Sequence, residues 1–381
     1  MGIESISKHA IAPHREQLAD GRVGSQAVDH RQPPLPLPLP LPLPSPSERL
    51  TRSVVSLLGR LDNRLQEISV AVKEFYLPPV AAPVDPAAGE AAMRRYFDER
   101  LAENIKTEQS LRTVLEKVEA SKVQGHLLEA ELRKLAALDQ PAHPKIQQWK
   151  DETLKKLGDL PHAPEAIRNA LSQVSGSDDF FEQLLAMLGL IKGEYLAVYE
   201  ELLTKYSEFF KEFNDTIMAK MGDWITGGND GKEVTISPDL YNALAALRDK
   251  YNQAPDGVLY PIAGAEPATE EEALKWAKAM GLPESAVHPD GNGGYRVMIV
   301  LTPLDAMMAA APRGGATWDT AKFQAWQTGF NSLEGDLKNQ LQILTTKYGN
   351  ANSYHENFNK LLSSQLSQYA EMLKAIASGI G

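Results

Sequence analysis

The chain has 381 residues, no cysteine and a net charge of −11, from 39 basic and 50 acidic side chains. The length allows two or three domains with a substantial core. Without cysteine, thiol nucleophiles, Cys-ligated zinc, iron–sulfur clusters and disulfides are excluded. The negative charge and the lack of a basic stripe argue against a nucleic-acid partner. The longest strongly apolar run, 298–301, is far short of the roughly 20 residues of a transmembrane segment, so the sequence predicts a soluble protein.

We expect residues 1–48 to be disordered. Charges are scattered over the first 30 residues and no apolar core of a signal peptide is present, so Sec-type export is not expected. Ile6 stands where a myristoylation signal needs a hydroxyl residue. Residues 33–46 alternate Pro with Leu, which predicts a semi-rigid polyproline II spacer. Pro33 to Pro36 gives PxxP, so an SH3-type ligand is the alternative to a plain linker.

The segment 49–140 has the pattern of a helical hairpin. Apolar residues follow a three- and four-residue spacing over 49–76 and again over about 89–138. The proline-rich run 77–86 separates the two patterns and cannot continue a helix. Two helices joined in this way are expected to pack antiparallel.

A connector over 141–178 precedes the first of two long helical rods. Short helices are expected at about 144–157 and 164–174, each opened by a proline near its first turn. The first rod covers 179–226, where apolar residues again recur every three or four positions. The glycines of 226–231 end it.

The second rod, within 318–381, carries the clearest pattern in the chain. Mostly apolar residues recur every seven positions in two series that are four positions apart, as in a coiled-coil seam. A helix from Trp318 to Ile376 would be about 90 Å long, so an elongated molecule is expected. The predicted seam of the paired rods consists of Leu188, Ile191, Tyr195, Val198, Leu202, Phe209, Phe330, Leu337, Leu341, Leu344, Tyr348, Phe358, Leu362 and Tyr369.

The insert over 227–317 predicts a small mixed α/β domain. The fold class is therefore mainly α: a long antiparallel intramolecular coiled coil with an N-terminal helical hairpin and this inserted domain. The expected elements are a helix over 238–251, a strand over 258–262, a helix opened by a capping box at Thr269, a strand over 295–301 and a helix over 302–311.

No catalytic, cofactor or metal motif is present. The histidines are dispersed, and HExxH, GxSxG, the P-loop and GxGxxG patterns are missing. Asp290 to Gly294 resembles the start of a calcium loop but lacks its later ligands, so a turn is favoured. His355 falls on the seam, where a buried histidine is favoured over a base or ligand. An enzyme with a pocket in 232–317 is the third hypothesis, and no acid–base pair or nucleophile supports it.

Polar residues interrupt the second rod over 348–354, which has the sequence YGNANSY. Four residues of poor helix propensity lie in the middle of the helix. Either neighbouring helices or a partner pair with the polar groups of this stretch, or the stretch faces solvent as a locally unstable part of the helix.

Several of these segments carry a family resemblance, which covers roughly 180–365 in order. The chain resembles the IpaD/SipD/BipD group of type III secretion needle-tip proteins. The matching segments are Glu194–Glu200, Trp224–Gly231, Asn292–Tyr295, Leu301–Asp305, Trp318–Trp326 with Gly329 and Phe330, Lys347–Ser353, Asn357 and Leu361–Ser364.

The resemblance implies a hydrophilic translocator that leaves through the secretion channel and forms a small oligomer, usually a pentamer, on the needle at the cell surface. It would hold secretion off until host contact and then help to recruit the hydrophobic translocators. The hairpin, here about 49–140, would act as a self-chaperone over the rods. Bile salts, sensed by enteric relatives, are not assigned to this chain. Needle docking would fall on Asn350, Asn352, Asn357, Lys360, Leu361 and Ser364, together with the tail. A generic coiled-coil adaptor is the alternative.

Overall fold

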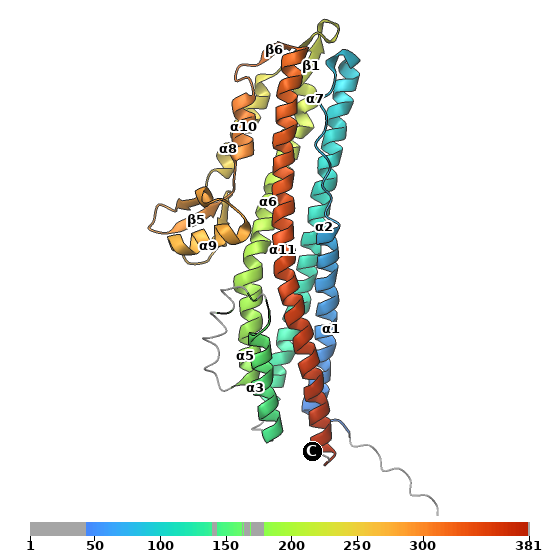
Figure 1. Cartoon of the computed structure of the whole chain (residues 1–381), viewed down its shortest axis with the longest axis vertical. Coiled ribbons are helices and arrows are strands. Elements are labelled where there is room, and N and C mark those ends of the chain that lie inside the picture. Colours follow the sequence, from blue (N-terminus) through green and yellow to red (C-terminus); the bar gives the residue numbers. More distant parts are fainter. Residues whose placement is uncertain (1–42, 139–142, 162, 164–167, 169–178, 380–381) are drawn as a thin grey trace, which may run out of the picture. The chain divides into compact units, whose positions relative to one another are not determined.

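A computed structural model describes residues 43–138, 143–161, 163, 168 and 179–379 (Figure 1). The chain divides into two units, 1–42 and 43–381, and all described residues belong to the second. The Pro-Leu spacer up to residue 42 and most of the helix expected at 164–174 lie outside the described residues.

Four long helices lie side by side in the second unit (Figure 1). They are α1 (Pro46–Lys73), α2 (Glu90–Leu138), α6 (Ala197–Thr216) and α11 (Thr320–Ala377). The chain runs in one direction along α1 and α6 and in the opposite direction along α2 and α11. With 58 residues, α11 is about 87 Å long. It packs against both α1 and α6. The hairpin helix α1 therefore shares the seam that the sequence predicted for the two rods alone.

The first helix begins earlier than predicted. Ser45 Oγ accepts a hydrogen bond from the backbone N–H of Glu48 over 3.1 Å, and Pro46 takes the first helical position, where its missing N–H costs nothing. Residues 46–48, predicted as part of the disordered head, are therefore helical. The helix predicted over 144–157 is confirmed as α3 (Pro144–Gly158).

The first rod consists of several helical pieces in place of one continuous helix. A π-helical segment at Leu190–Leu196 separates α5 (Phe180–Gly189) from α6, with Gly189 and Gly193 at or beside it. Beyond α6 a short 3₁₀ turn (Met218–Lys220) leads into α7 (Met221–Trp224). An inserted π turn shifts the register of the helix faces, which a uniform spacing of apolar residues does not reveal.

The insert contains two three-stranded antiparallel sheets. In the first the order is β1–β2–β6, from β1 (Ile225–Gly228), β2 (Glu233–Ile236) and β6 (Ala316–Asp319). In the second the order is β3–β5–β4, from β3 (Val258–Tyr260), β4 (Val287–Pro289) and β5 (Tyr295–Met298). Three helices accompany the sheets: α8 (Pro238–Tyr251), α9 (Glu270–Met280) and α10 (Thr302–Ala310).

Most predicted elements of the insert are confirmed. The capping box at Thr269 is present, because Thr269 and Glu272 each accept a hydrogen bond from the backbone N–H of the other. Asp290 forms a turn: its Oδ1 accepts from the N–H groups of Asn292 and Gly294 over 2.7 and 2.9 Å, and these bonds lower the pKa of the Asp290 carboxyl. The first sheet was not predicted, because the glycines after Trp224 indicated only the end of a helix.

Candidate interaction surface on the C-terminal helix

Five of the six predicted docking residues share one face of α11. Asn350, Asn357 and Ser364 are exposed and seven residues apart, which places them within about 40° of one another around the helix. Lys360 is exposed beside them and Leu361 is half-buried. Lys360 pairs with Glu356 over 2.5 Å. We call Asn350, Asn357, Lys360, Leu361 and Ser364 the exposed strip.

Asn352 lies on a different face, about 140° from Asn357, and is buried under α1. Its Nδ2 donates to the backbone oxygen of Leu65 over 2.9 Å and to Ser69 Oγ over 3.1 Å. One heptad later, Asn359 Nδ2 donates to the backbone oxygen of Leu58 over 2.9 Å. The sequence reasoning missed Asn359, although its seven-residue spacing from Asn352 was a signal that could have found it.

These two asparagines fix the register of α1 against α11 but leave polar atoms unsatisfied. In the described part of the chain, Oδ1 of Asn352 and Oδ1 of Asn359 are both buried without a hydrogen-bond partner. A buried acceptor in that state costs about 1–3 kcal/mol. Nearby, burial raises the pKa of Asp62, while the Lys360 ammonium opposes that shift. The contact between α1 and α11 therefore fixes one register, although some of its buried polar atoms lack hydrogen-bond partners among the residues that the structure describes.

The polar stretch 348–354 is packed against α1 over its buried half. Gly349 is buried, and a Cβ at this position would lie 2.8 Å from Val72 Cγ1. Ala351 and Asn352 are also buried, whereas Asn350 and Ser353 are exposed. Of the two alternatives left by the sequence, packing against a neighbouring helix is confirmed for the buried half.

The second hairpin helix is held by a buried ionic cluster. Glu334 of α11 accepts from Arg100 of α2 over 2.5 Å and from Lys338 over 3.1 Å. Lys338 Nζ also donates to Asn104 Oδ1 over 3.2 Å, and Asn104 Nδ2 donates to Asn214 Oδ1 of α6 over 3.1 Å. Burial lowers the pKa of Lys338. Because the partners come from three helices, the cluster holds α2, α6 and α11 in one register.

The connection between α1 and α2 is tied to the start of α11. The N–H of Val84 donates to Gln327 Oε1 over 2.8 Å, and Asn331 Nδ2 donates to the backbone oxygen of Ala81 over 3.1 Å. Gly231, between β1 and β2, has a φ of +79°, and a Cβ there would lie 2.6 Å from Ala87 Cα. The hairpin is thus attached along its helices and at its loop.

His355 borders a cavity of about 370 Å³ between α1, α2, the π segment, α6 and α11. Its ring is buried, as predicted, and within the described residues neither ring nitrogen has a hydrogen-bond partner. Burial, and secondarily the Lys192 ammonium, lowers the pKa of His355 to about 4. The charged groups that line the cavity form pairs, Lys192 with Glu129 at 2.5 Å and Lys122 with Glu200 at 2.8 Å.

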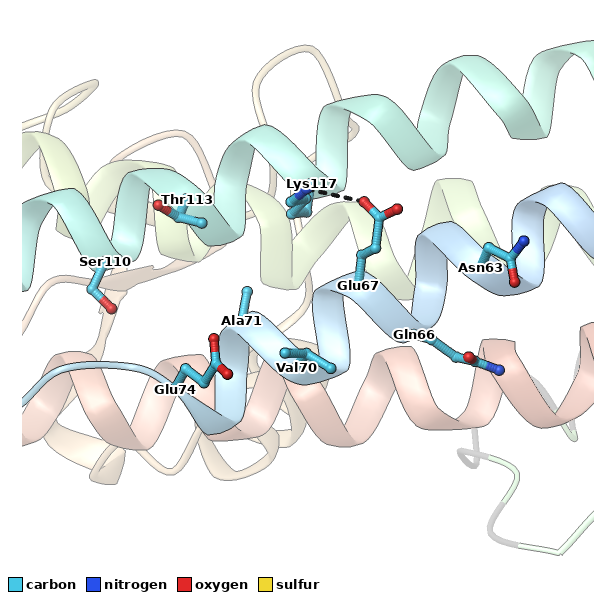
Figure 2. A pocket seen from close by; sticks show the side chains of 9 residues that line it. All are labelled: Asn63, Gln66, Glu67, Val70, Ala71, Glu74, Ser110, Thr113 and Lys117. Atoms are coloured by element: carbon cyan, nitrogen blue, oxygen red, sulfur yellow. Dashed lines mark hydrogen bonds and ion pairs between the residues drawn. The ribbon is translucent and has the colours of Figure 1, made fainter. Parts of the chain in front are cut away.

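A second hollow, a groove of about 620 Å³, lies on the outer side of the hairpin between α1 and α2 (Figure 2). Val70 and Ala71 line it from α1 and Glu74 from the residue just after α1, and Lys117 of α2 pairs with Glu67 across it over 3.0 Å. No nucleophile with an adjacent base is found among its lining residues. Over the described ranges, no three His, Asp or Glu side chains gather closely enough to hold a metal ion.

The structure places the predicted seam residues mainly in the interior. Tyr195 is partly exposed and the other thirteen are buried. Leu188, Ile191 and the residues of α6 face the same core as Phe330 to Tyr369 of α11, and side chains of α1 and α2 belong to that core as well. The seam is therefore part of a multi-helix core.

Comparisons with known proteins agree with this arrangement. The family model for type III secretion system tip complex components matches residues 88–376. The chain belongs to this family. Over 213 residues it is 38% identical to the cell invasion protein SipD of Salmonella typhimurium, which covers 53% of this chain and 62% of SipD. It is 34% identical over 214 residues to invasin IpaD of Shigella flexneri, covering 55% of this chain and 62% of IpaD.

These alignments span about three-fifths of the length of the two relatives. A solved structure, the pathogenicity island 1 effector protein from Chromobacterium violaceum, is similar with a TM-score of 0.61 and 25% identity, covering 84% of this chain and 98% of that protein. Among the helices that the structure describes, none is long and apolar enough to cross a membrane.

Proposed function

We propose that this chain is a needle-tip protein of a type III secretion system. It leaves the cell through the secretion channel, assembles as an oligomeric cap on the needle, restrains secretion and supports the recruitment of hydrophobic translocators on host contact. Family membership supports this assignment, and SipD and IpaD are named as invasion proteins. The proposed role is carried by helix contacts and involves no catalysis.

The observation that carries the proposal is the covering of α11 by the hairpin. Asn352 and Asn359 face α1, and each keeps one buried acceptor that has no partner in the described part of the chain. A helix that offered donors to both acceptors would pair with this face better than α1 does. We therefore propose that the hairpin acts as a self-chaperone: α1 covers the face until assembly. The exposed strip would then make the first contact with the needle subunit.

An engineered, reversible disulfide between α1 and α11 tests the self-chaperone proposal. A Cβ at residue 349 would lie 3.5 Å from Val72 Cβ, which suits a disulfide. The chain has no cysteine of its own, so Val72→Cys with Gly349→Cys would form one defined bond. We expect the oxidised variant to fail to assemble with purified needle subunit and the reduced variant to regain assembly. Equal assembly in both states would contradict the self-chaperone proposal.

The exposed strip is tested by adding positive charge on it. Asn357→Lys with Ser364→Lys changes two exposed side chains, so the fold should be kept. We expect at least tenfold weaker binding to the needle subunit, measured by surface plasmon resonance. Gln253→Lys, at an exposed position in the insert, is the matched control. An equal affinity for the strip variant and the control would refute the exposed strip as the docking surface. Absence of measurable binding of the unaltered chain to the needle subunit would favour the alternative, a coiled-coil adaptor without a secretion role.

A further inference from the structure

The helix α2 carries two apolar rows on opposite sides. The buried row contains Leu111, Val114, Val118, Ser121, Gly125, Leu128, Leu132 and Leu135. A second row with the same three- and four-residue spacing lies 120–180° away around the helix. It consists of the apolar Ala120, Val123, Leu127, Ala130 and Ala137, with the charged Lys134 as its one polar member. The side chains of Val123, Leu127 and the adjacent Leu138 are 63%, 50% and 42% exposed. Such a row on the solvent side is typical of a helix that pairs with another helix.

Charges beside this outer row have a symmetric order. Glu119, His126 and Arg133 are seven residues apart and follow one flank of the row. Within the chain Glu119 pairs with Lys122 at 2.7 Å and Arg133 with Glu129 at 4.0 Å. The side chains of Glu119 and Arg133 nevertheless stay 70% exposed, so each can also meet a charge on a second molecule. Their opposite charges lie at equal distances along the chain on either side of His126.

We propose that the outer row of α2 pairs antiparallel with the same row of a second copy of this chain. In this register Val123 lies opposite Leu127 of the second copy, and Ala120 opposite Ala130. Glu119 of each chain then meets Arg133 of the other, which gives two attractive pairs. A parallel arrangement would place Glu119 beside the neutral Gln124 and lose both pairs. Charge complementarity therefore selects the antiparallel pairing.

The pairing is distinct from the proposed cap. It uses the outer side of the hairpin, so it can form while α1 still covers α11. The outer row from Ala120 to Ala137 corresponds to about 27 Å of helix, which gives a contact smaller than a standard stable interface. A weak, reversible dimer is expected, with a dissociation constant on the order of 10–100 µM.

The full chain tests this proposal by sedimentation equilibrium. We expect a monomer–dimer equilibrium that Leu127→Glu weakens at least tenfold, because a charge would be buried in the contact. Ile105→Glu is the matched control, since Ile105 is a 39% exposed apolar residue elsewhere on the same helix. Glu119→Arg and Arg133→Glu should each weaken the dimer, and combining the two should restore it. A chain that stays monomeric, or a dimer unaffected by Leu127→Glu, would overturn the proposal.

Single cysteines test the orientation. We expect oxidation to link Val123→Cys chains to Leu127→Cys chains in a mixture, with little linkage in either variant alone. Linkage in each variant alone at the level of the mixture would instead indicate parallel pairing and overturn the proposal. The oxidised Val72→Cys, Gly349→Cys variant should dimerise like the unlocked chain, because α1 stays in place. Failure of this dimer is thus distinguishable from failure of the proposed cap.

Discussion

The buried histidine on α11 makes a measurable prediction about acid stability. Burial lowers the pKa of His355 from its ordinary value of 6.5 to about 4. The unfolded chain therefore takes up the proton more readily than the folded chain as the pH falls below 6.5. Stability is lost between about pH 6.5 and pH 4, and the loss from pH 7 to pH 4 is about 3 kcal/mol at 1.36 kcal/mol per pKa unit.

Replacing the ring isolates this contribution. His355→Leu removes the titrating group together with two buried ring nitrogens that have no partner among the described residues. We expect the variant to lose about 3 kcal/mol less than the wild type on going from pH 7 to pH 4, while the contributions of other groups cancel in the difference. Urea unfolding followed by circular dichroism at several pH values measures the free energies.

A matched control is His288→Leu, because the ring of His288 is exposed on β4. This variant should follow the wild-type pH dependence. If His355→Leu also follows the wild-type curve, folding does not suppress protonation of His355, and the reasoning from its burial is refuted.

Three further substitutions test the attachment of the hairpin. Glu334→Ala leaves the two buried cations of its cluster without a counter-charge, and we expect a loss of about 3–5 kcal/mol in urea unfolding. Gly349→Ala should lower the free energy of unfolding by about 1 kcal/mol, because the clash with Val72 exceeds the gain in helix propensity. Adding Val72→Ala should reverse this loss. If the effects of the two substitutions on stability simply add, the two residues are not in contact. Asn359→Leu removes a buried acceptor that has no partner among the described residues, so hydrogen exchange of α1 should slow. Faster exchange would show that the hydrogen bond from Asn359 to the backbone oxygen of Leu58 outweighs the cost.

The elements that the sequence predicted well depend on local signals. The capping residues Ser237 and Thr269 and the spacing of apolar residues along α2 and α11 act within one or two helical turns, so each can be read from a short window. The sheet β1–β2–β6 was missed because β6 joins β2 from about 80 residues later in the chain, and such pairing leaves no mark in a local window.

The candidate surface shows the same division. The residues of the exposed strip came from the resemblance to the tip proteins. A seven-residue spacing, which was not used, could have joined Asn359 to Asn352. It could not show that Asn352 lies under α1, because α1 and α6 have the same kind of apolar spacing and either could cover that face. The same limit applied to α2, where the spacing alone did not tell which of two apolar rows is buried.

The sequence by itself determined the helical segments, the long seam, the capping and turn residues and the resemblance to the tip proteins, because each is encoded by residues close together along the chain. Only the tertiary structure decided which helix covers which face and that the hairpin is tied to α11 through Asn352, Asn359 and Glu334. It also decided that the ring of His355 is enclosed with no hydrogen-bond partner among the described residues. The hydrogen bonds that Asn352, Asn359 and Glu334 form with the hairpin join residues more than two hundred positions apart. At such separations packing and desolvation select one arrangement among several that the local pattern permits.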